Sequence, residues 1–137
     1  DKKDLAHELG AHKVIDSEKE KAGTQLARMG GAYLILLTGI SARLFEECIA
    51  GLGPNGTLVV LAAIAETAKV IPAALLFGQK KIAGSIIGTR DDMDAMLAFA
   101  ADHGISPIVE RHPLGTVNDV LDRMRQGKIR LRAVLTP

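Results

Sequence analysis

Apolar runs and amphipathic segments alternate along this chain, in the order that is typical of a parallel sheet with crossover helices. Residues 33–37 form a continuous apolar run, as expected for a central parallel strand that is covered on both faces. Shorter apolar stretches predict further strands at 13–15, 57–61, 82–87, 107–110 and 132–135. The pattern therefore predicts an α/β protein with a doubly wound parallel sheet.

Helical spacing of apolar residues fills the segments between these strands. It predicts helices over about 5–9, 19–29, 45–52, 72–77 and 117–124. Gly30 and Gly31 are expected to end the second helix, and the residues 53–56 to form a tight turn into the strand at 57–61. Thr116 and Asp119 are expected to cap the last helix.

The most distinctive segment begins after Gly88, where a strand is followed almost at once by a helix. Thr89 and Asp92 have the spacing of a capping box. An apolar stripe at i, i+3, i+4 and i+7 is expected to face the core, and consists of Met93, Met96, Leu97 and Ala100.

Arg90 lies beside the start of this helix, where free backbone N–H groups favour an anion. Its guanidinium could bind a phosphate in a bidentate manner. The alternative is a solvated arginine that pairs with Asp91 or Asp94.

Composition restricts the function without choosing it. The chain has 137 residues, 47% of them hydrophobic and 24% charged, with a net charge of +1, as in an ordinary globular domain. Because no basic run is extended, nucleic acid and membrane surfaces are not expected partners. No apolar run is long enough for a bilayer span, and one cysteine cannot form an internal disulfide, so a reducing cytoplasm is the expected location.

Familiar chemical motifs are missing from these residues. No G-x-G-x-x-G sequence lies between a strand and the helix that follows it; the nearest approach, at 51–53, lies at the end of a predicted helix, which is the wrong context. No G-x-S-x-G sequence occurs. The charged segment at 1–10 has no strand before it, so we expect missing sequence upstream. Cys48 falls on the apolar stripe of its helix and is predicted to be a core residue. The four histidines are scattered, so no metal site is predicted. Asp16, Glu66 and Glu110 lie near strand ends with no evident acid–base partner.

Five collinear blocks of the sequence resemble the C-terminal part of the zinc-dependent medium-chain alcohol dehydrogenases. They are LGAHKVID, GGAYLILLTGIS, GLGPNGTLVVLAA, KKIAGSIIGTRDDMDAMLAFA and ISPIVERHPLGTVNDVLDRMRQGKIRLRAVL. The resemblance implies a partial Rossmann fold that lacks its first strands. Residues 1–87 would be the second half of the NAD(P)-binding domain, and residues 88–137 a segment that returns to the catalytic domain.

The resemblance also implies an activity for the parent protein. It would transfer a hydride between NAD or NADP and an alcohol, aldehyde or ketone, assisted by zinc whose ligands are absent from this chain. The chain alone would be inactive. The positions that would contact the cofactor are Lys2, Thr38, Gly39, Ile40, Ser41, Leu61, Ala62, Ala63, Ser85, Ile87, Arg90 and Arg132.

Within that set, the loop 38–41 would lie along the cofactor, and backbone groups at 61–63 and 85–87 would orient the nicotinamide carboxamide. Arg90 and Arg132 match positions that reach the pyrophosphate in some members, and Lys2 a position near the adenosine ribose. From the residues alone, each of these three side chains could instead be a solvated surface charge.

Association and alternative functions complete the sequence-based expectations. By resemblance, the strand from Ile82 to Ile86 would pair across a two-fold axis in a homo-oligomer. One alternative function is a zinc-free quinone or enone reductase with the same cofactor domain, and another is a non-catalytic half-domain for binding or assembly. Because part of the sheet would be uncovered, the isolated chain is expected to be partly molten or to self-associate.

Overall fold

The structure is a computed structural model that describes residues 2–137. The chain divides into two compact units. We call Lys3–Ile87 the sheet unit, and Gly88–Pro137, with which Lys2 is grouped, the C-terminal unit. Both contain parallel strands and helices, so the predicted α/β class is confirmed.

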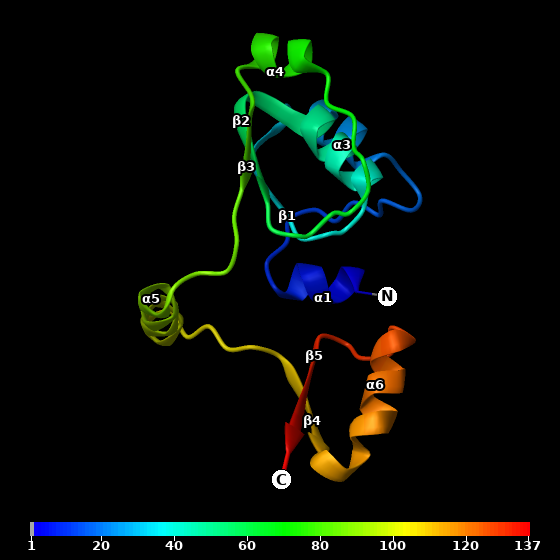
Figure 1. Cartoon of the computed structure of the whole chain (residues 1–137), viewed down its shortest axis with the longest axis vertical. Helices are drawn as coiled ribbons and strands as arrows, with labels where there is room; N and C mark the ends of the chain where they lie inside the picture. The colour runs from blue at the N-terminus through cyan, green and yellow to red at the C-terminus, as the bar shows by residue number, and fades with distance from the viewer. Residues whose placement is uncertain (1) are drawn as a thin grey trace. The chain divides into compact units, whose positions relative to one another are not determined.

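Three parallel strands in chain order form the sheet of the sheet unit (Figure 1): β1 (Ala32–Leu37), β2 (Leu52–Val60) and β3 (Lys81–Gly84). Leu37 lies opposite Val60, and Val60 lies opposite Gly84, so the three carboxyl ends are in register. This alignment places the segments that follow the strands next to one another.

Four helices belong to this unit: α1 (Lys3–Glu8), α2 (Ala22–Arg28), α3 (Ala42–Gly51) and α4 (Pro72–Gly78). The α3 helix supplies Cys48 and Ile49 to the core, where they meet Leu37, Leu52 and Leu58. Leu58 is fully buried, and Cys48 is buried as the sequence predicted.

The α2 and α3 helices pack closely because glycine residues lie where the two helices meet. A Cβ atom on Gly23 would collide with the backbone carbonyl of Glu47. The Glu47 carboxylate accepts a hydrogen bond of 2.8 Å from the backbone N–H of Ala22, the first residue of α2. As predicted, α2 ends at a glycine pair, and Gly30 has a φ of 97° that favours glycine.

Several predicted elements of the sheet unit are wrong in extent or environment. The segment 13–15 is not a strand, because no described segment pairs with it. Helix α2 begins three residues after its predicted start at 19, since a turn occupies 17–19. The expected strand at 82–87 ends at Gly84.

The segment 53–56 is also different from the prediction. It is not a turn that precedes a strand but an irregular stretch inside β2, where the register with β1 shifts between Ala32 and Leu34. Asn55 adopts a φ of 60° there. The shift is compatible with the close backbone approach of Gly53 to Gly31, where neither residue has a side chain.

The run 33–37 is a strand, but β1 is not covered on both faces in the described chain. β1 lies at one edge of the sheet, and Leu34 and Leu36 on one of its faces are 54% and 59% exposed. Ile35 and Leu37, on the other face, pack with α3 residues in the core.

The C-terminal unit consists of a helix, a two-stranded parallel sheet and a second helix (Figure 1). Its elements are α5 (Arg90–Asp102), β4 (Val109–Pro113), η1 (Leu114–Thr116), α6 (Val117–Arg125) and β5 (Arg132–Thr136). β4 starts two residues after the predicted strand start at 107. Its pairing with β5 fixes the start, since Val109 lies opposite Arg132.

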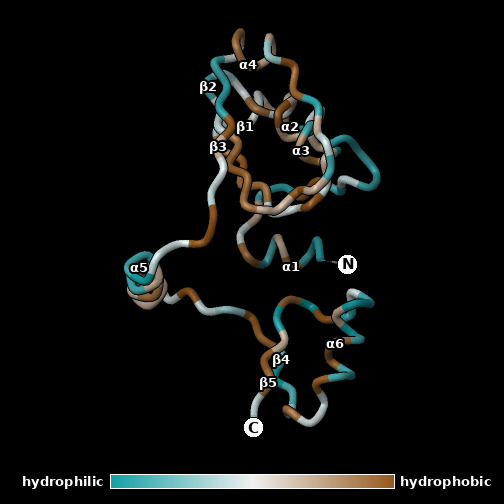
Figure 2. Tube along the Cα trace, viewed as in Figure 1, coloured by the Kyte–Doolittle hydropathy of each residue, from teal (hydrophilic) through white to brown (hydrophobic). Residues whose placement is uncertain are grey.

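Helix α5 confirms one prediction and contradicts another. The capping box is present: the backbone N–H of Thr89 donates to Asp92 at 2.7 Å, and that of Asp92 donates to the Thr89 hydroxyl. The apolar stripe does not face a core, since no residue of α5 is buried and Met93, Met96 and Leu97 are each at least half exposed. Figure 2 shows α5 nearly end-on, with hydrophilic residues on one side and hydrophobic residues on the other.

Thr116 occupies the N-cap position of α6, as predicted, but neither Thr116 nor Asp119 caps the helix with its side chain. Thr116 makes no capping hydrogen bond to α6; its hydroxyl instead donates to the carbonyl of Pro113 at 2.8 Å. The 3-10 turn η1 explains this difference, because it precedes α6 directly and bends the chain so that the hydroxyl reaches backwards. Asp119 lies in the first turn of α6, where an acidic residue is favoured without acting as a cap.

Candidate functional site

The carboxyl edge of the three-stranded sheet is the candidate site. One backbone hydrogen bond continues the pairing beyond each strand end: Leu61 N–H donates to Leu37 at 2.9 Å, and Ser85 N–H donates to Val60 at 3.0 Å. The structure therefore brings together the segments at 38–41, 61–63 and 85–87. In open parallel sheets, ligands bind at this edge.

These segments expose the groups that a ligand could contact. Thr38, Ile40, Ala63, Ser85 and Ile87 are exposed, and Ile40 and Ile87 are 72% and 88% exposed. Exposed aliphatic side chains of this kind would be costly to leave in water, and they offer an apolar surface.

The other named residues of these segments differ in exposure. Gly39, Ser41 and Ala62 are half-buried, and Leu61 is exposed. A Cβ atom on Gly39 would meet the side chain of Leu44, so the missing side chain lets the chain pass close to α3. Ser41 is the N-cap of α3, and its hydroxyl accepts from Leu44 N–H at 3.5 Å.

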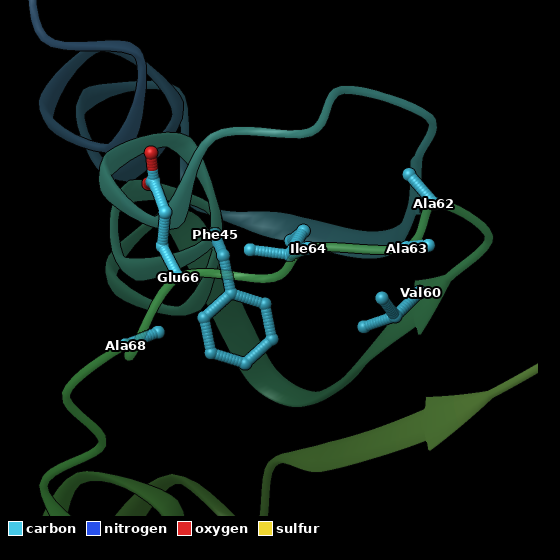
Figure 3. A pocket seen from close by; sticks show the side chains of 7 residues that line it. All are labelled: Phe45, Val60, Ala62, Ala63, Ile64, Glu66 and Ala68. Atoms are coloured by element: carbon cyan, nitrogen blue, oxygen red, sulfur yellow. The ribbon is translucent and has the colours of Figure 1, made fainter.

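An open pocket of about 370 Å³ lies where the chain leaves β2 (Figure 3). Its walls come from α3, the end of β2 and the following residues, and they include Phe45, Val60, Ala62 and Ile64. Most of these groups are apolar; Glu66 is the charged exception. The pocket can therefore accept an uncharged, mostly apolar group.

The Glu66 carboxylate accepts a hydrogen bond of 3.1 Å from the backbone N–H of Ala42, the first residue of α3. Farther along, Lys69 N–H donates to the Glu46 carboxylate at 2.8 Å. Sequence reasoning noted Glu66 near a strand end but found no partner for it. Its partner is 24 residues away, and no local pattern signals that contact.

Lys2, Arg90 and Arg132 belong to the C-terminal unit, whereas the carboxyl edge belongs to the sheet unit. All three are exposed. Arg90 is the first residue of α5, and Arg132 is the first residue of β5. Among residues 2–137, neither guanidinium forms a hydrogen bond or an ion pair, and Arg90 does not pair with Asp91 or Asp94.

The amino end of α5 already carries its own anion. The Asp92 carboxylate accepts from both the backbone N–H and the hydroxyl of Thr89, at 2.7 and 2.8 Å. These hydrogen bonds lower the pKa of Asp92 below its ordinary value. Arg90 therefore stands beside a negatively charged helix start.

Glu110 is the centre of a polar cluster in the C-terminal unit. Its carboxylate accepts from Arg130 N–H at 2.7 Å and from the Arg123 guanidinium at 3.3 Å. His112 Nε2 lies 3.6 Å from the same carboxylate and has no hydrogen-bond partner among the described residues. The Arg130 hydrogen bond, followed by the charges of Arg123 and His112, lowers the pKa of Glu110.

The described residues do not fit a zinc site. Within residues 2–137, no group of three or more His, Cys, Asp or Glu side chains could hold a metal ion. Cys48 lies in the core, and burial, with the nearby Glu47 charge, raises the pKa of its thiol, which disfavours the thiolate that zinc binds. Among residues 2–137, no helix has both the length and the apolar character needed to cross a membrane.

Comparison with curated proteins finds relatives along nearly the whole chain. An alcohol dehydrogenase of Geobacillus stearothermophilus is 34% identical over 136 residues, which are 98% of this chain and 40% of that protein. Alcohol dehydrogenase patD of Penicillium expansum is 35% identical and is matched over 39% of its length. The chain thus spans about two fifths of these relatives' length.

Solved structures agree with the fold. The alcohol dehydrogenase of the archaeon Aeropyrum pernix matches 99% of this chain and 40% of its own, with a TM-score of 0.85 at 25% identity. A cinnamyl alcohol dehydrogenase of Sorghum bicolor matches with a TM-score of 0.79 at 28% identity, over 98% of this chain and 38% of that one. A family model described as zinc-binding dehydrogenase matches residues 1–102. The resemblance predicted from the sequence is confirmed, and the chain belongs to the zinc-dependent medium-chain alcohol dehydrogenase family.

Proposed function

We propose that this chain is the cofactor-side portion of an NAD(P)-dependent oxidoreductase that interconverts alcohols with aldehydes or ketones. The observation that carries the proposal is the carboxyl edge, where three exposed segments meet in a chain of this family. Bound there, a nicotinamide cofactor would supply hydride acceptance and donation.

The residues of this chain would bind and orient the cofactor. Backbone groups at 61–63 and 85–87 are adjacent and can bind a carboxamide, which fixes the face that the nicotinamide ring presents. The small residues at 38–41 allow close approach. Lys2, Arg90 and Arg132 are cations for the ribose and pyrophosphate portion.

We expect the alcohol to be polarised by residues of the parent protein that are not in this chain. The family name implies zinc, but the described residues offer no site for the metal. The chain by itself would therefore bind cofactor groups without turning over an alcohol. The single cysteine favours a reducing cytoplasm.

The test is the protein expressed from its native reading frame, with whatever that frame encodes on either side of these residues. We expect NAD+- or NADP+-dependent oxidation of primary or secondary alcohols, followed as cofactor absorbance, and loss of the activity on chelation of zinc. Reduction of quinones or enones that resists chelation would favour the zinc-free reductase instead. If the protein binds no cofactor, the alternative that remains is the non-catalytic module for binding or assembly.

We also propose that the parent protein associates through β3. This strand lies at an edge of the described sheet and pairs with β2 on its other side. An open strand edge can bind the same strand of a second copy. A mass measurement in solution is expected to give a dimer or larger oligomer, and a monomer at micromolar concentration would contradict this.

A further inference from the structure

The loop at residues 61–71, between β2 and α4, has no helix or strand of its own. Its first three residues carry the backbone groups assigned above to the carboxamide. Two carboxylate contacts attach the rest of the loop to α3: Glu66 with Ala42 N–H, and Glu46 with Lys69 N–H. The Glu66 contact is the one nearer to residues 61–63.

Packing supports this loop on one side only, where Ile64 packs against the core. The open pocket of about 370 Å³ lies against Ala62, Ala63 and Ile64, so these residues lack close neighbours on that side. In Figure 3, Glu66 extends toward the helix, while Phe45, Val60 and Ile64 surround the open space. A loop beside a void can shift toward it unless a directional contact opposes the movement.

Resting on the proposed function, we propose that Glu66 is a positioning residue for the cofactor. Its carboxylate, bound to the first backbone N–H of α3, sets the distance between the 61–71 loop and the helix, and thereby the orientation of the backbone at 61–63. Glu66 itself need not touch the cofactor.

The charge of Glu66 adds a second consequence. The amino end of α3 carries partial positive charge that would attract a phosphate, and the Glu66 carboxylate compensates this charge from 3.1 Å. The part of the carboxyl edge beside α3 is therefore poorly suited to a phosphate, in keeping with an uncharged carboxamide at 61–63 and 85–87. Glu66 thus favours one direction of cofactor binding as well as one loop position.

The test uses the protein from its native reading frame and steady-state kinetics with varied NAD(P)+. We expect Glu66→Ala to raise the KM for the cofactor about tenfold, as for loss of one charge-assisted hydrogen bond, with kcat changed less than about twofold. Glu66→Gln keeps an acceptor oxygen and should recover most of the loss. Glu20→Ala removes an exposed carboxylate with no side-chain hydrogen bond among residues 2–137, and should have no effect.

The donor side of the contact can be removed separately. Ala42 is the first residue of α3, where proline is well tolerated, and Ser41 before it has an extended ψ of 127° that is compatible with proline. Ala42→Pro deletes the N–H that Glu66 binds. It should raise the same KM, and the double variant should be no worse than the more severe single variant.

The outcomes separate the two proposals. A wild-type protein without NAD(P) binding or turnover overturns the proposed function. An active wild type whose cofactor KM is unchanged in Glu66→Ala, or a double variant with multiplied effects of about a hundredfold, overturns the role of Glu66. Amide exchange provides a readout besides activity: Glu66→Ala should accelerate exchange at residues 61–66, and unchanged exchange would also overturn the proposal.

Discussion

The sheet unit and the C-terminal unit are stabilised in different ways. Nine hydrophobic residues are buried among those described, and all but Val120 and Ile129 belong to the sheet unit. The C-terminal unit instead gathers a carboxylate, two arginine residues and a histidine around the pairing of β4 with β5. Burial of apolar area stabilises a fold far more than solvent-accessible ion pairs do.

The difference indicates that the sheet unit can retain its structure more independently. Helix α5 of the C-terminal unit illustrates the weaker support there: it is well capped but has no buried residue. Capping specifies where a helix begins, whereas burial of one face provides most of its stability.

The largest effect is expected for Leu58→Ala. Leu58 is the fully buried core side chain among residues 2–137, so its truncation should reduce the free energy of unfolding by about 3 kcal/mol. The change in stability is measured by amide exchange of the sheet-unit residues in a denaturant series. Leu76→Ala, at a side chain that is 72% exposed, is the control. An equal loss of protection in the C-terminal unit would show that the units are not independent.

Gly23→Ala is expected to have the next largest effect, about 2 kcal/mol of lost stability, because the new methyl group would collide with the Glu47 carbonyl. The α2 and α3 helices would have to separate, which amide exchange in both helices would detect. Gly84→Ala adds a methyl group to open space in the same unit and should be tolerated. A neutral Gly23→Ala would contradict the close helix packing.

Val120→Ala should cost less, about 1.5 kcal/mol, for the two methyl groups removed from a buried position of α6. Because the C-terminal unit has few such positions, this change should abolish protection of β4 and β5 while β1 to β3 remain protected. Leu121→Ala, one residue along and 43% exposed, is the control. Retained protection of β4 and β5 would mean that the polar cluster suffices.

The smallest effect concerns pH. Because the pKa of Glu110 is lowered by the Arg130 N–H and then by Arg123, its carboxylate stabilises the folded C-terminal unit above its ordinary pKa of 4.5. That contribution is lost as the pH falls through the lower pKa of the folded state. Glu110→Gln should flatten this acid dependence in a pH series of exchange measurements. An unchanged pH profile in Glu110→Gln would refute the assignment.

Short-range patterns in the sequence predicted the elements that depend on neighbouring residues. The capping box of Thr89 and Asp92 needs only two residues three positions apart, and it was found. The apolar run at 33–37 identified β1 within one residue, because composition alone distinguishes such a strand. The segment 13–15 failed because a strand also requires a pairing partner, which its own residues do not encode.

The candidate site was predictable only in part. The family resemblance, rather than any local pattern, singled out the segments 38–41, 61–63 and 85–87. The structure aligns them at one edge because parallel strands align their carboxyl ends. The contact of Glu66 with Ala42 was not predictable, because it joins residues 24 positions apart through a loop without periodicity. The exposed stripe of α5 shows the same limit: spacing predicts which residues share a face, not what covers that face.

The strand order of the sheet unit has a consequence for how the protein is made. β1, β2 and β3 are neighbours in space in the order in which the ribosome synthesises them. Each new strand therefore emerges beside an edge that is already present, and α3 is translated between the two strands that it covers. Every pairing in this sheet thus joins strands that are consecutive in the sequence, and such local topology favours fast folding.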